Sequence, residues 1–322
     1  MTRQSDATRQ KGMALILVLW VMVLLIIMAG SFSLTMQREL SVVGNVRDKA
    51  QTLALAEAGI HYSVLMLLNP SEIDRWKSNA SIYQVNFNDT QIRIRLMQES
   101  GKIDINKAEI PLLTTLMQAA GVEDIDEISR YVDAIMDWRD NDTLRRLNGA
   151  EEDEYQDAKL KYAPTNKPFS SIEDLQLVLG ITPEMYKRLE PLVTVYSKQA
   201  SIDPSEAPQS LLRGLPDIEE SVVDDYLEQR VESIRNQVPV PAFPTTPGVQ
   251  GGNSNIGVYT ILSEAKLANG SVGKVKAVIK KELDPNGGPF QVLDWKQGNV
   301  LEGSLFNENN DKLVINSNDG QT

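Results

Sequence analysis

Cysteine is absent from this chain of 322 residues, and histidine occurs once, at position 61. The lack of cysteine excludes disulfide bonds, thiolate zinc sites, iron–sulfur clusters and cysteine nucleophiles. A single histidine argues against a histidine-rich metal site and against a Ser-His-Asp triad. Basic residues are also scarce, since 32 Lys and Arg face 44 Asp and Glu, and this acid excess disfavours contact with nucleic-acid phosphates. We therefore expect the function to lie in binding surfaces, and we expect no enzyme.

Charge is missing altogether from residues 13–36. A helix of about 20 apolar residues spans a bilayer, and this run is too long for the apolar core of an ordinary cleaved secretory signal. The segment before it carries Arg3, Arg9 and Lys11 against Asp6. Because positively charged flanks stay in the cytoplasm, we expect a single membrane span with the rest of the chain on the opposite side.

The helical pattern continues past the membrane segment through residues 37–68. Its apolar stripe runs from Leu40 and Val43 to Leu67, and Pro70 ends it. We therefore expect one long helix whose first half lies in lipid and whose second half packs on a head domain.

Alternating apolar and polar residues then predict two β-hairpins, one around Asn88-Asp89 and one around Asn269-Gly270. In the second hairpin, Lys276 falls on the face expected to be polar. The expected strands are 82–87 with 90–97, 257–267 with 272–283, and a further strand at 289–295. A sheet of three or more strands would bury the apolar stripe of the helix.

Between the hairpins, residues 101–245 have a helical signature and hold 15 Lys and Arg against 28 Asp and Glu. Nearly all of the net charge of −12 therefore comes from this block. We interpret it as a separate helical domain inserted into the β-rich head. A linker rich in Pro, Gly and Ser follows it.

Helix start and stop signals are frequent inside the block. They predict helices that begin at the capping pairs Asn106/Glu109 and Ser170/Glu173 and at Thr182-Pro183, and that end at Gly121 and Gly180. The segment 169–197 resembles a helix-hairpin-helix or SAM-like unit. Residues 103–116 also echo residues 202–215 at an offset of 99 positions, which suggests two related helical halves.

Acidic residues crowd the stretch 133–154. Neighbouring carboxylates repel one another, and a hard divalent cation with oxygen ligands relieves that repulsion. The spacing does not match an EF-hand loop. On the residues alone, a solvated acidic face and a cation site are equally consistent with this stretch.

Several motifs occur together in this chain. They are a charged leader that ends at Gly12 before the apolar run, GKIDIN at 101–106, DWRDND at 137–142 followed by NGAEEDEY, FSSIEDLQLV at 169–178 with GIT, and LVTVYS at 192–197. The combination resembles the type II secretion minor pseudopilin K family, also called general secretion pathway protein K.

The resemblance implies processing by a prepilin peptidase. The enzyme would cut between Gly12 and Met13, and the new amino group of Met13 would be N-methylated. It further implies a structural subunit at the tip of the pseudopilus, which assembles with minor pseudopilins I and J and with the core subunits to initiate or cap the fibre and aid protein export.

Leu17 departs from the common pilin pattern, in which glutamate occupies the fifth mature position. That glutamate neutralises the α-amine of a neighbouring subunit. Because an unpaired charge in an apolar environment costs several kcal/mol, a subunit with Leu17 suits the end of a filament.

The resemblance also implies calcium in the helical block, because the matching positions are those of DWRDND and GAEED. The candidate ligands are Asp137, Asp140, Asp142, Glu151, Glu152 and Asp153.

The predicted architecture is α+β: a long N-terminal membrane helix with a pilin-like antiparallel sheet, plus a large inserted all-α domain of the SAM-like or helix-hairpin-helix kind. The leader covers 1–12, the membrane span 13–36, the periplasmic head 37–100 and 246–322, and the insert 101–245. We expect a single-pass protein of the bacterial inner membrane with its C-terminal region in the periplasm.

The alternative is a membrane-anchored helix-hairpin-helix protein that binds nucleic acid. Its hairpin at 178–184 offers backbone amides, but its one charged side chain is the acidic Glu184. Binding to phosphates needs Lys or Arg, so we expect no nucleic-acid partner.

Overall fold

The computed structural model describes residues 11–72, 74–236, 238–244, 246, 248–249, 256–281, 288–298, 300, 303–311 and 313–316. Residues 1–10 of the predicted leader, and the predicted strand end at 282–283, lie outside the described residues. The chain divides into two compact units, 1–51 and 52–322.

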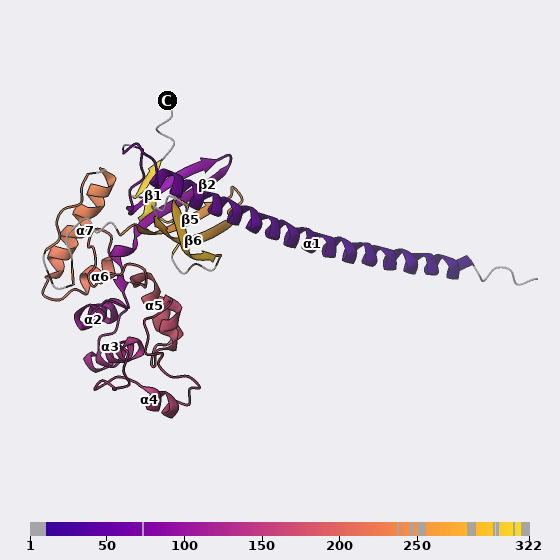
Figure 1. The fold of residues 1–322 in the computed structure, drawn as a ribbon. Coiled ribbons are helices and arrows are strands. Elements are labelled where there is room, and N and C mark those ends of the chain that lie inside the picture. The colour runs from indigo at the N-terminus through magenta and orange to yellow at the C-terminus, as the bar shows by residue number, and fades with distance from the viewer. Residues whose placement is uncertain are drawn as a thin grey trace, which may run out of the picture. The chain divides into compact units, whose positions relative to one another are not determined.

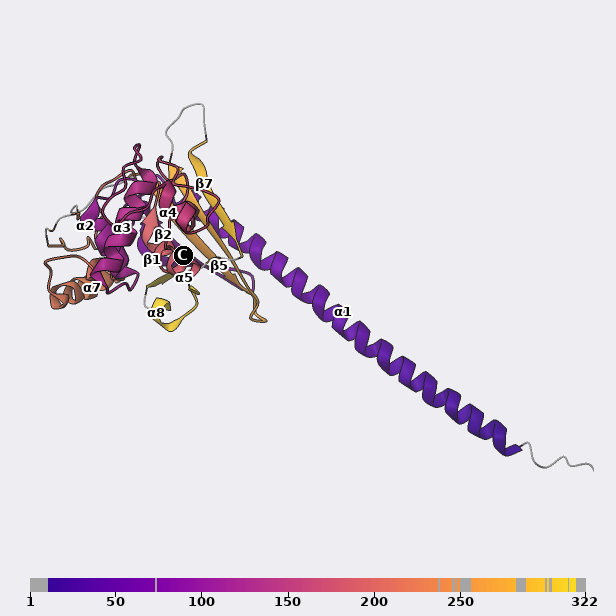
Figure 2. The ribbon, with the colours of Figure 1, turned by 90° about the horizontal axis from the view of Figure 1, so that it is seen from below.

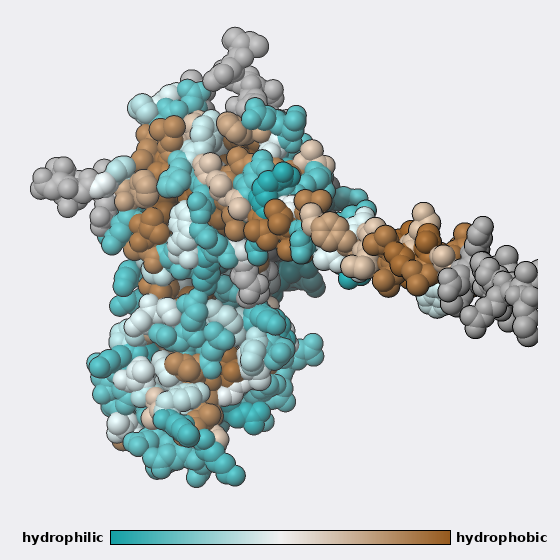
Figure 3. Space-filling view, turned by 90° about the vertical axis from the view of Figure 1, so that its right-hand side faces the viewer, coloured by the Kyte–Doolittle hydropathy of each residue, from teal (hydrophilic) through white to brown (hydrophobic). Residues whose placement is uncertain are grey.

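The first unit consists of the N-terminal part of helix α1 (Lys11–Leu67). From Leu15 to Met28 its large apolar side chains are 46–72% exposed, and this stretch is long and apolar enough to cross a membrane. The brown surface of the helix in Figure 3 shows the same property. Leu40 and Val43 are also exposed, and their packing on the head stays a prediction.

The second unit contains a six-stranded sheet in the order β7-β6-β5-β2-β1-β8. Both predicted hairpins and the predicted third strand are confirmed, and all neighbours are antiparallel except β1 and β8, which are parallel. Figures 1 and 2 show the strands, with β7 at one edge in Figure 2. The strands are β1 (Asn79–Phe87), β2 (Thr90–Gln98), β5 (Val258–Lys266), β6 (Val272–Lys281), β7 (Phe290–Gln297) and β8 (Val314–Asn316).

The C-terminal part of α1 packs on one face of this sheet. Ala56, Ile60 and Val64 are buried and share a core with side chains of β2, β5 and β6. Each fully buried Ile or Val contributes roughly 1.5–3 kcal/mol. Two glycines permit the close approach: a Cβ on Gly59 would lie 2.3 Å from the hydroxyl of Ser263, and one on Gly273 would lie 2.8 Å from the backbone nitrogen of Leu53.

The opposite face of the sheet is covered as well. Lys276 lies on this face, as its alternation with Val275 and Ala277 predicts, but it is only 3% exposed. Its ammonium lies 3.9 Å from Glu190, which belongs to the helical block. The sequence pattern could not show this partner, because Glu190 is 86 positions away.

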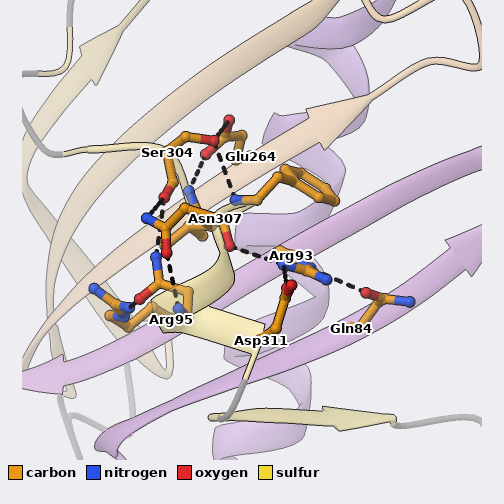
Figure 4. Close-up of polar contacts among 10 residues, drawn as sticks. Gln84, Arg93, Arg95, Glu264, Ser304, Asn307 and Asp311 are labelled. Atoms are coloured by element: carbon orange, nitrogen blue, oxygen red, sulfur yellow. Dashed lines mark hydrogen bonds and ion pairs between the residues drawn. The ribbon is translucent and has the colours of Figure 1, made fainter.

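A C-terminal clasp, which we define as residues 303–316, covers another part of that face and was not predicted. It contains α8 (Glu308–Asp311) and β8. Glu264 of β5 accepts hydrogen bonds from the Ser304 hydroxyl at 2.7 Å and from the Leu305 backbone N–H, while Arg93 of β2 donates to Asp311 at 2.6 Å (Figure 4). The clasp thus adds β8 to the sheet and supplies hydrogen-bond partners for the charged side chains Arg93 and Glu264.

The helical block has a hydrophobic core of its own, and its helices α2 to α5 gather in one group in Figure 1. Helix α2 packs against α3 and α6, and α6 packs against α7. The elements are η1 (Glu99–Gly101), β3 (Ile103–Asp104), α2 (Ile110–Ala119), α3 (Ile125–Arg139), α4 (Glu152–Asp157), η2 (Ile172–Leu177), α5 (Pro183–Leu189), η3 (Glu190–Leu192), β4 (Val193–Thr194), α6 (Gln209–Arg213) and α7 (Glu220–Arg235).

Two predicted helix caps are wrong. Asn106 does not cap α2; its side-chain amide donates to the carbonyl of Phe169 at 2.9 Å and accepts from the N–H of Phe169 at 2.7 Å. The capping box of η2 is Ser171 with Asp174, one position beyond the predicted pair. The cap by Thr182 is confirmed, since its hydroxyl accepts from Met185 N–H at 3.2 Å.

Each of the two predicted halves contains an arginine that donates hydrogen bonds to two backbone carbonyls. Arg139 at the end of α3 donates to the carbonyls of Ile105 and Ala108. Arg230 in α7 donates to those of Pro204 at 2.9 Å and Ala207 at 2.7 Å. The accepting carbonyls are related by the offset of 99 positions, so the sequence echo corresponds to a repeated local structure.

Replacing Gly273 by alanine should destabilise the second unit by about 1–3 kcal/mol, because the new methyl group would meet the backbone of α1. Thermal unfolding of the full chain in detergent would measure the change. Gly303→Ala is the matched control, since a Cβ at Gly303 meets nothing within 4 Å. Equal melting temperatures for the two variants would contradict the packing described for α1 and β6.

Candidate functional site

Four of the six predicted calcium ligands lie around the end of α3 and the start of α4. Asp137 is in the last turn of α3 and Asp140 is its C-cap, while Asp142 follows in the loop and Glu151 is the N-cap of α4. The side chain of Asp137 is fully buried. A helix C-terminus carries a partial negative charge, so Asp137 and Asp140 lie where a further negative charge is unfavourable.

Burial and mutual repulsion raise the pKa values of this group. Burial raises the pKa of Asp137 to about 6, and the charge of Asp140 adds to the effect. Burial together with the charges of Asp137, Asp140 and Asp142 raises the pKa of Glu151 to about 7. The pKa of Asp140 is raised as well, first by burial and then by Asp142. The cluster therefore holds more negative charge than its surroundings neutralise.

The protein supplies one main counter-charge, Arg146. Its Nε lies 3.4 Å from Asp137 Oδ1, its Nη2 lies 3.8 Å from Asp140 Oδ2, and its backbone N–H donates to Asp137 Oδ2 at 3.2 Å. Oδ1 of Asp140 and Oε1 of Glu151 are buried without a hydrogen-bond partner among the described residues. Unsatisfied buried carboxylate oxygens suit a hard cation, which takes oxygen ligands.

The other two predicted ligands lie apart. Glu152 and Asp153 are exposed on the first turn of α4, and Glu152 accepts a hydrogen bond from Gln156 at 3.0 Å. In the part of the chain that the structure describes, no three acidic or histidine side chains are arranged to hold a metal ion as they stand. The chemistry of the four inner carboxylates fits calcium, and its binding stays a prediction.

Two polar networks join the helical block to the sheet, and the sequence did not indicate either. In the first, Glu99 and Lys102 form a buried ion pair of 2.6 Å, and the Thr260 hydroxyl of β5 donates to Glu99. Although burial opposes it, the Lys102 ammonium lowers the pKa of Glu99. In the second, Lys296 of β7 lies 3.2 Å from Glu190 and also pairs with Glu173.

Glu206 lies beside residues 98–101, where the chain passes from strand β2 into the helical block. Its Oε2 accepts from the backbone N–H of Gln98 at 3.4 Å, and a Cβ on Gly101 would lie 2.4 Å from its carbonyl carbon. Burial raises its pKa to about 8, and the nearby charge of Asp203 contributes, whereas Arg230 opposes the shift.

The processing positions lie at the start of α1. Gly12 and Met13 are both helical, and Leu17 is 66% exposed. Cleavage, methylation and a role of Leu17 at the tip stay predictions. The single histidine, His61, is exposed on α1, with its ring 6.4 Å from that of Trp295.

A profile of the family described as "Type II secretion system (T2SS), protein K" matches residues 86–198. A protein named type II secretion system protein K from Klebsiella pneumoniae is 24% identical over 319 residues, covering 90% of this chain and 97% of that protein. Its namesake from Aeromonas hydrophila is 27% identical over 212 residues, covering 58% of this chain and 63% of that protein.

Among solved structures, the chain is similar to one in the crystal structure of the GspK-GspI-GspJ complex from the type 2 secretion system of enterotoxigenic Escherichia coli. The TM-score is 0.47 and the identity is 15%, with 82% of this chain and 99% of that chain covered.

The raised pKa of Glu206 predicts a pH-dependent stability. The folded state binds its proton up to about pH 8, whereas an unfolded glutamate releases it near pH 4.3. Stability should therefore fall as the pH rises between these values, and Glu206→Gln should remove a loss on the order of a few kcal/mol at pH 8. Chemical unfolding of the full chain at several pH values would measure it.

Glu228→Gln is the matched control, because Glu228 is exposed on α7. Parallel stability curves for Glu206→Gln and the wild-type chain would contradict the assignment.

Proposed function

We propose that this chain is a minor pseudopilin of the type II secretion system protein K family, to whose members it is similar, and that it sits at the tip of the pseudopilus, where it initiates or caps the fibre. The observation that carries the tip position is Leu17 in a helix of exposed apolar side chains. A subunit docked below another one would need a carboxylate at this position to neutralise the amine of its neighbour, because an unpaired charge in lipid is costly.

The proposed partners follow from the family resemblance. Minor pseudopilins I and J would pack laterally against α1, by small and apolar side chains along the helix, and the pseudopilus core subunits would follow below. Exposed apolar residues of α1 beyond the charge-free run support such contacts, among them Leu40, Val42, Val43 and Val46. A prepilin peptidase would first cut between Gly12 and Met13, and Met13 would be methylated.

We also propose the location and the domain division. The apolar part of α1 would lie in the inner membrane, and the second unit would lie in the periplasm. Residues 37–100 and 246–322 would form a pilin-like head, with 101–245 as an inserted domain of the helix-hairpin-helix kind. The separate hydrophobic cores of the helices and of the sheet support this division.

The role we propose is structural rather than enzymatic. Nucleic-acid binding gains no support, since α5 offers Lys187 and Arg188 within a block that holds 28 acidic residues against 15 basic ones.

We propose in addition that the inner carboxylates of the acidic cluster hold calcium. Asp137, Asp140, Asp142 and Glu151 would supply oxygen ligands, with Glu152 and Asp153 as the outer members of the predicted set. When bound, the ion would neutralise the cluster and fix the loop between α3 and α4. The unpaired oxygens of Asp140 and Glu151 support this.

Leu17→Glu should leave leader cleavage intact but lower the fraction of the protein found at fibre ends several-fold, because the new carboxylate lets other subunits dock above it. Mass spectrometry of the N-terminus would report cleavage, and gold labelling of isolated fibres would report position. Leu19→Glu adds the same charge to the same membrane helix and serves as the control. If both variants behave alike, the argument from Leu17 fails.

Calcium added to the chelator-treated full chain should release or absorb measurable heat and raise the melting temperature by several degrees, as expected for a ligand at about 100 times its Kd. Asp140→Asn combined with Glu151→Gln should abolish both effects. Asp157→Asn, at the exposed end of α4, is the control that should retain them. No heat and no thermal shift in the wild-type chain would exclude the site.

A further inference from the structure

The loop between α3 and α4 turns two leucines to solvent. Leu144 is 76% exposed and Leu147 is 89% exposed, the highest value for any large hydrophobic side chain in the described ranges. Between them, Arg145 and Arg146 turn toward carboxylates of the block. Both arginines are thus paired with carboxylates, while the two leucines have their apolar side chains in solvent. We call residues 144–147 the loop tip.

The exposed leucines do not result from a loosely held loop. The N–H of Leu144 donates to Asp142 at 2.8 Å, and the guanidinium of Arg145 donates to Glu154 at 2.9 Å. On the far side of the tip, Asn148 donates to Asp133 through its backbone at 3.1 Å and through its side chain at 3.2 Å.

Two further contacts complete the support. Arg146 is bound to Asp137 through its backbone and its side chain, and Asn166 donates to the carbonyl of Asp142 at 2.7 Å. A tip whose backbone is fixed in advance loses little conformational freedom when it binds, so its apolar contacts translate more fully into affinity. Single exposed leucines need no explanation, but two leucines on a fixed tip form a preorganised anchor.

The charge around the tip selects the kind of partner. Residues 133–157 contain nine Asp and Glu against three Arg. All three arginines are engaged, since Arg139 donates to backbone carbonyls while Arg145 and Arg146 bind carboxylates. Arg145 pairs with Glu154 in the first turn of α4, so the exposed acids of that turn, Glu152 and Asp153, place negative charge near the tip, which repels anionic lipid and nucleic acid.

We propose that the loop tip is a docking anchor for a protein partner that presents an apolar pocket with a rim of Lys and Arg. Leu144 and Leu147 enter the pocket, and the surrounding carboxylates face the basic rim. Charge complementarity of this kind speeds association and selects the partner. The anchor is a second interaction surface, separate from the helix-to-helix packing of α1 in the proposed function.

Site-specific photo-crosslinking tests the proposal in the full chain, in cells that make the complete secretion system. A benzophenone amino acid replaces Leu147, and in a matched control it replaces Leu177, which is 42% exposed in the same helical block. The expected result is a crosslink to one other protein from position 147 and none from position 177. Its crosslinked peptide should map to an apolar pocket lined at the rim by Lys or Arg.

Binding of that purified partner then measures the anchor. Leu144→Ser combined with Leu147→Ser should raise the Kd at least tenfold, and raising NaCl from about 50 to 500 mM should weaken wild-type binding, because salt screens the rim. The double variant should keep the wild-type melting temperature and still co-purify with its α1 partners, which separates a failed anchor from a failed assembly. A crosslink to lipid, to a second copy of the chain, to a pocket without basic residues, or to nothing would overturn the proposal.

Discussion

Strand β5 is buried on both faces along nearly its whole length, and a sheet with such a central strand is stable only when both of its faces are covered. One cover is α1, which the glycines at 59 and 273 bring close to the strands. The other is assembled from distant parts of the chain. Leu262 meets Leu305 of the C-terminal clasp, and Thr260 meets the buried pair Glu99 and Lys102 at the start of the helical block. The sheet therefore organises both the N-terminal helix and the insert around one strand.

The second cover contains charged groups, which has a cost. Buried ion pairs contribute little net stability, because desolvation offsets their attraction, whereas removing one partner leaves an unpaired charge and costs about 3–5 kcal/mol. Two such pairs lie between the helical block and the sheet, Glu99 with Lys102 and Glu190 with Lys296. An arrangement in which the block left the sheet would disrupt the contacts of these charges and would therefore be less stable. We interpret them as groups that specify where the block sits, while the apolar cluster of Ile82, Leu262 and Leu305 stabilises the C-terminal clasp on the sheet.

Local sequence patterns predicted those parts of the fold that local chemistry determines. Asn269-Gly270 marked a hairpin because Gly270 adopts a φ of 88°, a region that glycine enters freely. The pattern failed where a partner is remote: Asn106 has the spacing of a cap, yet it binds the backbone of Phe169, 63 positions away. The acidic cluster shows the same limit. The short spacing suggested that its residues meet, but the first turn of α4 directs Glu152 and Asp153 to solvent, which no count of carboxylates reveals.

The two helical halves explain why the acidic loop occurs where it does. In both halves an arginine donates hydrogen bonds to two backbone carbonyls. In the first half, Arg139 follows its acceptor Ala108 by 31 positions, whereas in the second half Arg230 follows Ala207 by 23 positions. Arg230 therefore lies inside α7, which continues to Arg235, whereas Arg139 is the last residue of α3. In the first half the chain leaves α3 directly after Arg139, at the helix C-terminus, which carries a partial negative charge. Asp137 and Asp140 add two carboxylates at the same place. Positive charge is needed at that point, and Arg146 supplies it by folding the loop back, which in turn leaves Leu144 and Leu147 facing outward.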